Sequence, residues 1–302
     1  MKKLLLLLFL SVSSLFHLAY SKNSNEKKTT LIVATYNIRL QTPADSLERS
    51  WSNRKGEVAR LIKQYNFDVF GVQEVGNSNQ EADLKKLLKE YTYFGKGRDN
   101  QLGTAGEQIG IFYKTNRFTI RDYGYFFLSP TPETMSIGWD AAFRRMCVWI
   151  KLVDRHTDKS FYVFCSHFDH MGVKARVESA KLIVQKVKEI ASDQPVLFVG
   201  DLNTSPESTE MYKTLAVALE DSREISEKTP KGSLGTFNGY NASVSDFPRS
   251  VRIDYIFCRN FKVLNYQVLN NKYSSKTYPS DHFPVMIECR INKSQKPGSS
   301  GK

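Results

Sequence analysis

The chain has 302 residues, with 43 Lys and Arg against 31 Asp and Glu, which gives a formal net charge of +12. A chain of this length forms one large domain or two small ones and buries about 75% of the surface that its unfolded form exposes. A small scaffold that depends on disulfides is therefore excluded, and the positive charge favours anionic partners such as nucleic acid, anionic lipid head groups or a bacterial envelope.

The first residues predict a secretory signal peptide over residues 1–21. Lys2 and Lys3 form a basic start, an apolar run follows, and Ala19 and Ser21 have the small–x–small pattern of a cleavage site. A retained membrane anchor is the alternative, but serines interrupt the apolar run, which falls short of the roughly 18 residues that a span needs. We therefore expect export to a periplasmic or extracellular location.

The remaining chain predicts one folded domain over residues 31–291 with polar ends. The segments 22–30 and 292–302 are rich in Lys and small polar residues, so we expect a disordered basic linker and a disordered tail there. The four cysteines lie in apolar, strand-like runs: Cys147, Cys165, Cys258 and Cys289. Buried thiols without disulfides are therefore expected.

Short runs rich in Val, Ile and Phe alternate with longer segments of helical apolar spacing, which predicts an α/β protein. The expected strands are 31–36, 69–73, 109–113, 145–153, 161–166, 196–200, 253–258, 263–269 and 285–289. The expected helices, each covering a sheet face, are 52–64, 80–89, 173–191 and 208–219. The polar segment 221–249 predicts a long surface loop inside the domain.

Polar residues follow four of the expected strands. Asn37, Glu74 and His167 each follow one apolar run, and Asp201 with Asn203 follows a fourth. Ligands of α/β sheets bind beyond the carboxyl ends of the strands, so these side chains are predicted to share one rim. Their oxygen atoms suit Mg²⁺. Taken singly, each has a structural explanation as a cap, a surface charge or a core histidine, and only the set favours a site.

The last strands bring a second group of polar residues. Asp254 opens one strand, and Asp281 with His282 directly precedes another. If the last three strands form a meander, the first and third begin at the same edge. Asp254 can then accept the ring N–H of His282, which is a general-base arrangement, while Asp281 faces a cation. The alternatives are a salt bridge between Asp254 and Arg252 and a simple turn ahead of Pro284.

The order of these motifs resembles that of the endonuclease/exonuclease/phosphatase superfamily, whose fold is DNase I-like. The motifs run from Leu31 to Cys289 and are NIR at Asn37, QE at Glu74, SHFDH at His167, GDLN at Asp201, RIDYIF at Asp254 and SDHFPV at His282. The resemblance implies a four-layer α/β/β/α sandwich with two stacked mixed β-sheets and the site at one end. With the signal segment, it implies an exported bacterial member.

By this resemblance, Glu74 is the principal ligand of Mg²⁺, with Mn²⁺ as the alternative ion, and Asn37 and Asp281 complete the metal site directly or through waters. Asp201 would align or activate the attacking water, and Asn203 would donate to the phosphate. Hydrolysis of a charged phosphate ester needs a cation, donors for the transition state and a placed water, so each residue type meets one of these needs.

The resemblance also implies that two histidines act on the phosphate or on its departing oxygen, with the division between acid and base left open. His282 would be paired with Asp254. His167 would be oriented by Glu107, so a hydrogen bond between these two side chains is predicted.

Further residues are placed like substrate-binding groups of the family. Arg144 or Arg145 stands where nucleases carry a phosphate-binding arginine, with a surface cation or a partner of Asp140 as the alternative. Asp169 and His170 directly follow the first histidine motif. They could contact substrate, serve a second metal or cap the next helix, and substrate contact is favoured.

The implied activity is metal-dependent hydrolysis of a phosphoester, preferably a phosphodiester, by metal-assisted attack of water. The substrate would be nucleic acid, a lipid head group or a small phosphodiester, without an obligate protein partner and with the protein as a monomer. A secreted nuclease is one alternative, and a lipid phosphodiesterase or phosphatase, which an exposed aromatic hairpin at 123–128 would favour, is another. A non-catalytic phosphate-binding envelope protein is least favoured, because binding alone needs no acid–base pair.

Overall fold

The computed structural model describes residues 29–76, 79–99, 106–208, 210–272 and 277–292. The expected signal peptide and most of the expected linker and tail lie outside these residues. At the borders, the carbonyl of Thr30 accepts a hydrogen bond from Arg117 (3.0 Å), and the backbone N–H of Asn292 donates to the carbonyl of Asn260 (2.9 Å).

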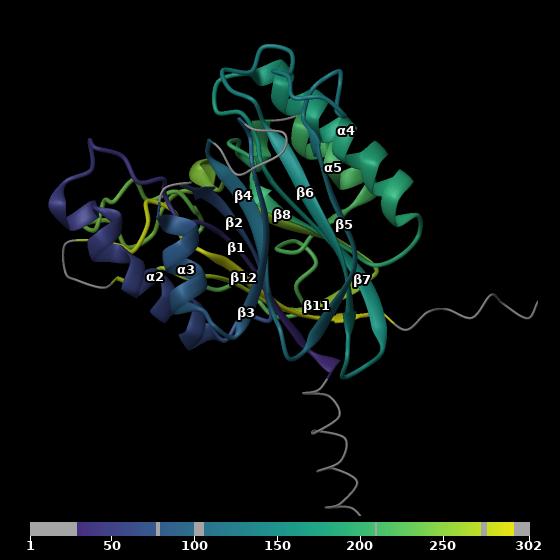
Figure 1. The fold of residues 1–302 in the computed structure, drawn as a ribbon, viewed down its shortest axis with the longest axis horizontal. Coiled ribbons are helices and arrows are strands. Elements are labelled where there is room, and N and C mark those ends of the chain that lie inside the picture. The colour runs from purple at the N-terminus through teal and green to yellow at the C-terminus, as the bar shows by residue number, and fades with distance from the viewer. Residues whose placement is uncertain (1–28, 77–78, 100–105, 209, 273–276, 293–302) are drawn as a thin grey trace, which may run out of the picture.

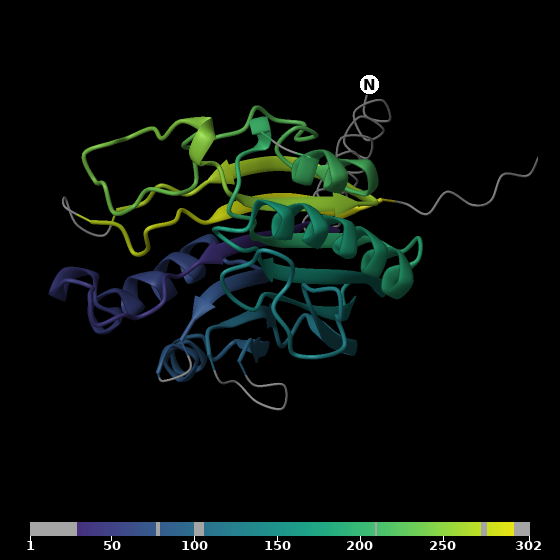
Figure 2. The same ribbon diagram turned by 90° about the horizontal axis from the view of Figure 1, so that it is seen from above.

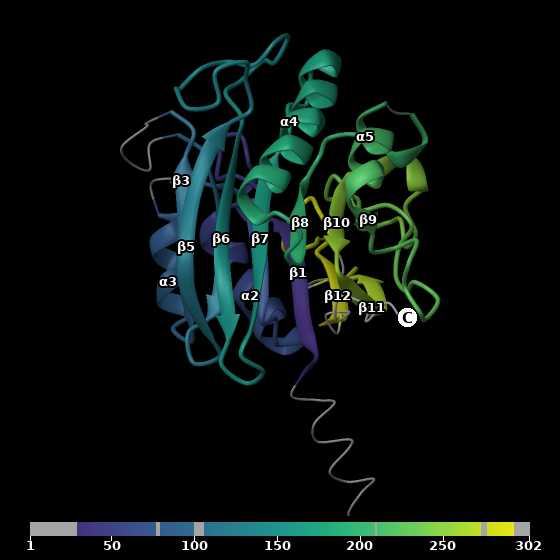
Figure 3. The same ribbon diagram turned by 90° about the vertical axis from the view of Figure 1, so that its right-hand side faces the viewer.

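Two six-stranded mixed sheets form the centre of the molecule (Figure 1). Sheet A has the order β11 (Phe261–Val268), β12 (Val285–Ile291), β1 (Leu31–Asn37), β2 (Val69–Val75), β4 (Gln108–Lys114) and β3 (Tyr91–Gly97). Sheet B, seen in Figure 3, has the order β5 (Phe118–Phe127), β6 (Met146–Asp154), β7 (Lys159–His167), β8 (Val196–Asp201), β10 (Asp254–Arg259) and β9 (Glu220–Asp221). The pairs β1–β2 and β7–β8 are parallel, and the other pairs are antiparallel.

The helices of the described residues cover the outer faces of the sheets (Figure 1). On sheet A lie α2 (Trp51–Tyr65) and α3 (Gln80–Leu87), and on sheet B lie α4 (Val173–Ala191) and α5 (Glu210–Ala218). Short 3-10 helices are η1 (Leu47–Arg49), η2 (Pro206–Ser208) and η3 (Arg249–Val251). The order helix, sheet, sheet, helix is the expected four-layer sandwich.

Three apolar cores hold the layers together, because the central strands are apolar on both faces. In β1, Val33 packs between the two sheets, whereas the next residue, Ala34, packs with Ile62 of α2. In β7, Phe164 packs with Ile183 of α4. The four cysteines are buried and unpaired, as expected.

All nine expected strands and four expected helices are present, with borders shifted by a few residues. Three strands at sheet edges, β3, β5 and β9, have no full counterpart among the expected strands, since solvent-facing polar residues interrupt their apolar pattern. The segment 123–128 belongs to β5 and its continuation, where Phe126, Phe127 and Leu128 are buried. It is an ordinary edge strand and not an exposed aromatic hairpin.

The expected meander of the last three strands is wrong. β10 lies in sheet B, whereas β11 and β12 lie in sheet A. The chain passes from one sheet to the other after β10. The start of β10 and the start of β12 therefore meet across the sandwich instead of along one sheet.

Residues 222–253 form the expected long loop, which contains η3 and isolated bridges but no longer element. Figure 2 shows this loop (green) on the same side of the molecule as α2 (purple). Among the described residues, none of the helices combines the length and the apolar character needed to cross a membrane.

Candidate active site

Three polar residues stand side by side on adjacent strands of sheet B. His167, at the end of β7, is in register with Asp201 at the end of β8, and Asp201 is in register with Asp254 at the start of β10. Residues in register on neighbouring strands point to the same face of a sheet. All three side chains are buried, and they share the rim that the sequence predicts.

Asn37 and Glu74 reach the same place from sheet A. Asn37 ends β1, and Glu74 lies in the irregularity of the β2–β4 pairing between Val72 and Val75. The φ of Glu74 is 59°, a left-handed conformation that costs a non-glycine residue energy and is concentrated at functional sites. Asn37 Nδ2 donates to Glu74 Oε1 (2.9 Å) and to Asp201 Oδ2 (3.0 Å), which joins the two sheets.

His282 and Asp254 form the predicted pair. Because a carboxylate only accepts, His282 Nδ1 donates to Asp254 Oδ2 (2.9 Å), and His282 Nε2 lies 3.8 Å from Asp201 Oδ2. Burial alone would lower the pKa of His282, but the carboxylates of Asp254 and Asp201 raise it well above its ordinary value. Burial raises the pKa of Asp254, and the charge of His282 opposes that rise.

A second carboxylate holds His167. His167 Nδ1 donates to Glu107 Oε1 (3.1 Å), which is the predicted hydrogen bond. Arg98 Nη1 and Arg145 Nη1 lie 3.3 and 3.6 Å from the same oxygen. Burial would raise the pKa of Glu107, but the hydrogen bond and charge of His167, together with both arginines, lower it to about 2. Glu107 is therefore an anion at every pH near neutrality.

Asp201 lies between the two histidines. Its Oδ2 is 3.4 Å from His167 Nε2, and its Oδ1 accepts the backbone N–H of Asn203 (2.9 Å). The side chain of Asn203 donates to the carbonyl of Phe168 (3.0 Å), and its Nδ2 is 3.0 Å from His167 Nε2. Asn203 thus supports both groups at the end of β8.

The carboxylates at this rim fit a divalent cation. Ligand atoms of Glu74, His167 and Asp201 lie within 4.8 Å of one another. Burial raises the pKa of Asp281 and the Glu74 carboxylate adds to the rise, while His282 opposes it. Crowded carboxylate oxygens are the donors that Mg²⁺ and Mn²⁺ prefer, and a cation would relieve their mutual repulsion.

Asn37 and Arg39 make the candidate metal site differ from the expected one. Asn37 Oδ1 accepts the backbone N–H of Arg39 (3.0 Å), so its amide nitrogen and not its oxygen faces the carboxylates. Asn37 is thus placed to orient Glu74 and Asp201. Arg39 Nη1 lies 3.5 Å from Asp281 Oδ2, which puts a fixed cation at the margin of the acidic group.

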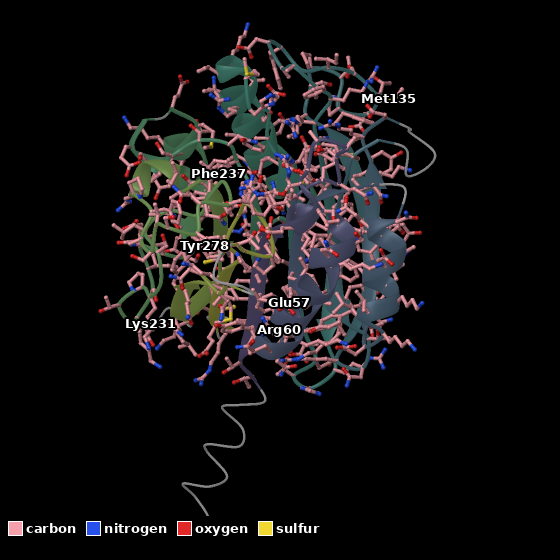
Figure 4. The ribbon with its side chains drawn as sticks, turned by 90° about the vertical axis from the view of Figure 1, so that its left-hand side faces the viewer. Glu57, Arg60, Met135, Lys231, Phe237 and Tyr278 are labelled. Atoms are coloured by element: carbon pink, nitrogen blue, oxygen red, sulfur yellow. The ribbon has the colours of Figure 1, made fainter. Side chains whose placement is uncertain are left out.

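A cleft of about 420 Å³ opens over these residues. The walls around its acidic and histidine groups include Arg39, Arg98, Phe143, Arg145, His170 and Phe237. Figure 4 shows Phe237 in the upper half of the molecule, and Lys231 and Arg60 in the lower half. The cleft therefore lies at one end of the sandwich, beyond the carboxyl ends of β1, β2, β7 and β8.

Two expected substrate-binding residues do not line this cleft. Arg144 points to Asp99, with Nη1 3.3 Å from Oδ1, and Arg145 takes the place in the cleft. Asp169 is buried, and its oxygens accept four backbone N–H groups at 2.8–3.2 Å. Its carboxylate holds two loops together instead of facing a substrate. His170 does line the cleft, as expected.

Arg54 lies near the first motif in the sequence, where a cationic group could flank the cleft, but the structure gives it a buried supporting role. It is fully buried in α2, and its guanidinium donates to the carbonyls of Ile38, Arg39 and Pro279. These carbonyls belong to the segments directly after β1 and before β12, which carry metal-site residues. Within the described ranges, no carboxylate lies within ion-pair distance of Arg54. Its place in the apolar stripe of α2, between Trp51 and Val58, is the signal that identifies it.

Phe237 is a residue that sequence patterns do not assign. Its ring packs against the ring of His282, with centroids 5.0 Å apart and planes at 67°. The preceding Thr236 accepts the backbone N–H groups of Ile253 (2.9 Å) and Asp254 (3.1 Å). The polar loop 222–253 therefore reaches the site and covers one side of the histidine.

The fold and this site indicate a family of proteins, and comparison with known sequences confirms that family. Residues 34–282 match the Endonuclease/Exonuclease/phosphatase family, so the chain belongs to that family. Its members are hydrolytic phosphoesterases and generally depend on a divalent metal.

Individual relatives cover the domain almost completely. A family protein from Bacteroides thetaiotaomicron is 37% identical and has a TM-score of 0.82, with 88% of this chain and 99% of that chain aligned. A mannosyl-6-phosphatase from the same organism is also 37% identical, with a TM-score of 0.80 over 86% of this chain and 99% of that chain. An uncharacterised protein of Acanthamoeba polyphaga mimivirus is 27% identical over 78% of this chain and 91% of its own length.

Proposed function

We propose that this protein is a divalent-metal-dependent phosphatase that removes a phosphate group from a phosphorylated saccharide. One observation carries the hydrolytic part: two carboxylate-held histidines, His167 and His282, converge on Asp201 in the cleft that contains Glu74. Binding of phosphate alone would not require two oriented imidazoles.

Each residue of the rim has a proposed task. Glu74, Asp201 and Asp281 would hold Mg²⁺ or Mn²⁺, which would neutralise phosphate oxygens and make a bound water more acidic. Asp201 accepts a hydrogen bond from the attacking water and so aims it at phosphorus. His282, which neighbouring carboxylates keep protonated, donates Nε2–H to a phosphate oxygen. Asp201 takes up the proton that the attacking water loses, and His167 gives a proton from Nε2 to the departing oxygen, which leaves as the alcohol.

Three features support a phosphorylated saccharide and a phosphate monoester over the phosphodiester that the motifs imply. The cleft volume of about 420 Å³ lies within the usual range of small-molecule sites. Arg39, Arg98 and Arg145 on its walls complement a doubly charged terminal phosphate. The third feature is the similarity over nearly the whole domain to a mannosyl-6-phosphatase.

A panel of phosphate esters tests this function. Phosphate release is measured from a hexose 6-phosphate, bis-nitrophenyl phosphate, DNA and phosphatidylinositol, each with Mg²⁺, with Mn²⁺ and with EDTA. We expect hydrolysis of the hexose phosphate with either cation, and loss of that hydrolysis with EDTA and in the Asp201→Asn variant. Preference for a diester, a polymer or a lipid, or activity that survives EDTA, would overturn the proposal.

We also propose that the protein is exported and begins near Lys22 after removal of residues 1–21. The basic start, apolar run and cleavage pattern of this segment support export. N-terminal sequencing of protein recovered outside the cytoplasm should begin at Lys22. Recovery in the cytoplasm with Met1 intact would contradict export.

A further inference from the structure

The cleft has one wall on which two exposed rings, those of Phe143 and His170, have no part in the proposed chemistry. Phe143 and Arg145 come from the end of the β5–β6 loop, His170 from the loop after β7, and Arg98 directly follows β3. Phe143 is 47% exposed, and the side chain of His170 is 44% exposed. Aromatic rings left this open at the edge of a polar cleft are available to a ligand.

The side chains of this wall form a stack. The ring of Phe143 lies parallel to that of His170, with centroids 5.7 Å apart and planes at 18°. The guanidinium of Arg98 lies 4.7 Å from the centre of the same phenyl ring. Both rings remain partly exposed in this arrangement, so the wall offers flat aromatic surface to the cleft.

The contact with Arg145 fixes the tautomer of His170. Arg145 Nη2 lies 3.3 Å from His170 Nδ1, and because an arginine only donates, Nδ1 carries the lone pair and Nε2 carries the proton. The buried Nη1 of Arg145 makes no hydrogen bond among the described residues and lies 3.6 Å from Glu107 Oε1. The wall thus offers the cleft an open imidazole ring with an Nε2–H donor.

Asp169 makes this wall rigid. Its carboxylate accepts the backbone N–H groups of Ala142 and Phe143 in one loop and of Met171 and Gly172 in the other, at 2.8–3.2 Å. Burial would raise the pKa of Asp169, but these N–H groups hold it below its ordinary value. A surface ordered before binding loses less conformational entropy when a ligand arrives.

We propose that this wall is the subsite for the sugar ring and that His170 is its specificity-determining residue. This inference rests on the proposed phosphatase function and extends it to the group esterified to phosphate. A pyranose ring offers a flat row of C–H groups to the imidazole face and a hydroxyl oxygen to His170 Nε2–H. An acyl chain would leave this donor without an acceptor, which costs binding energy.

The test compares two substrates with the same kind of primary alcohol, a hexose 6-phosphate and the acyclic glycerol phosphate. The ratio of their kcat/KM values is measured for wild type, His170→Ala and His170→Phe. His156→Ala, an exposed histidine in the turn between β6 and β7, is the matched control. We expect the ratio to fall about 10-fold in His170→Ala, mainly through KM for the hexose phosphate. The ratio for His170→Phe should lie between those of wild type and His170→Ala, since phenylalanine retains a ring face but lacks the donor.

Other outcomes separate the subsite from the chemistry. An unchanged ratio in His170→Ala, or an equal fall in His156→Ala, would overturn the subsite while leaving the phosphatase function intact. A wild type that prefers a 5′-nucleotide to the hexose phosphate, with that preference lost in His170→Ala, would overturn the sugar as its ligand. A wild type that hydrolyses neither test substrate would overturn the phosphatase function itself.

Discussion

The two carboxylate–histidine pairs of the site have the same geometry in opposite electrostatic surroundings. Asp254 is fully buried beneath His282, and burial raises its pKa. The hydrogen bond and charge of His167 lower the pKa of Glu107 to about 2, and Arg98 and Arg145 add to this fall. Each carboxylate orients one imidazole through Nδ1.

This difference shows that a shared motif does not imply a shared role. The charge of Asp254 is balanced mainly by His282, so the pair favours an imidazolium that can donate to phosphate. Glu107 has two permanent cations, Arg98 and Arg145, beside it in addition to His167. The first pair suits binding of an anion, and the second suits reversible proton transfer.

Asp201, which both pairs face, should give the largest effect. We expect Asp201→Asn to lower kcat by at least about 10³, because the amide lacks the negative charge that would activate the attacking water and hold the cation. The substitution preserves shape, so the melting temperature should change little. Wild-type-like turnover in a folded variant would remove Asp201 from the mechanism. His282→Ala is a less clean probe, since it also leaves Asp254 buried without a partner.

Asp254→Asn should weaken the pair of Asp254 and His282 and lower kcat less than Asp201→Asn does. The amide still orients the imidazole but no longer stabilises its charge, so we expect kcat to fall about 10²-fold. The pKa of His282, followed by NMR of its ring protons, should fall in the variant. A pKa of His282 that does not change would show that Asp254 does not hold the imidazole charged.

Glu107→Gln should lower the free energy of unfolding in a way that depends on pH. The pKa of Glu107 lies at about 2 in the folded protein against an ordinary value of 4.5, and each unit is worth about 1.4 kcal/mol, so ionised Glu107 contributes up to about 3 kcal/mol near pH 7. A carboxyl group with a lowered pKa stabilises the folded protein at pH values above its ordinary pKa of 4.5. This contribution is lost as the pH falls from 4.5 towards 2. Urea unfolding should therefore show a wild-type advantage at pH 7 that begins to shrink below about pH 5. An advantage independent of pH would exclude this charge effect.

Substitution of Arg145 should give the smallest effect on activity, and its neighbour Arg144 provides the control. Arg145 lines the cleft, whereas Arg144 points to Asp99 outside it. We expect Arg145→Ala to raise KM about 10-fold, and Arg144→Ala to change KM less than about 2-fold. Equal effects of the two substitutions would contradict the placement of the phosphate-binding arginine.

The chain motifs predict the fold and bring most of the site together because each polar residue directly follows or precedes an apolar strand. The closeness of Asp254 and His282 is correctly predicted, although the meander behind that prediction is wrong, since strands of either sheet can end at the same rim. Asp169 and Arg144 are misplaced because neighbouring residues point in different directions, which spacing alone does not resolve. Arg54 has no recognisable motif, and its role depends on carbonyls from segments distant in the sequence.

Hydrolysis of the hexose 6-phosphate in ¹⁸O-labelled water tests the central claim most directly. Water aimed at phosphorus by Asp201 breaks the P–O bond, so we expect one ¹⁸O atom in each released phosphate and none in the sugar. With Mg²⁺ present, label in the sugar, or no release of phosphate, would contradict this claim.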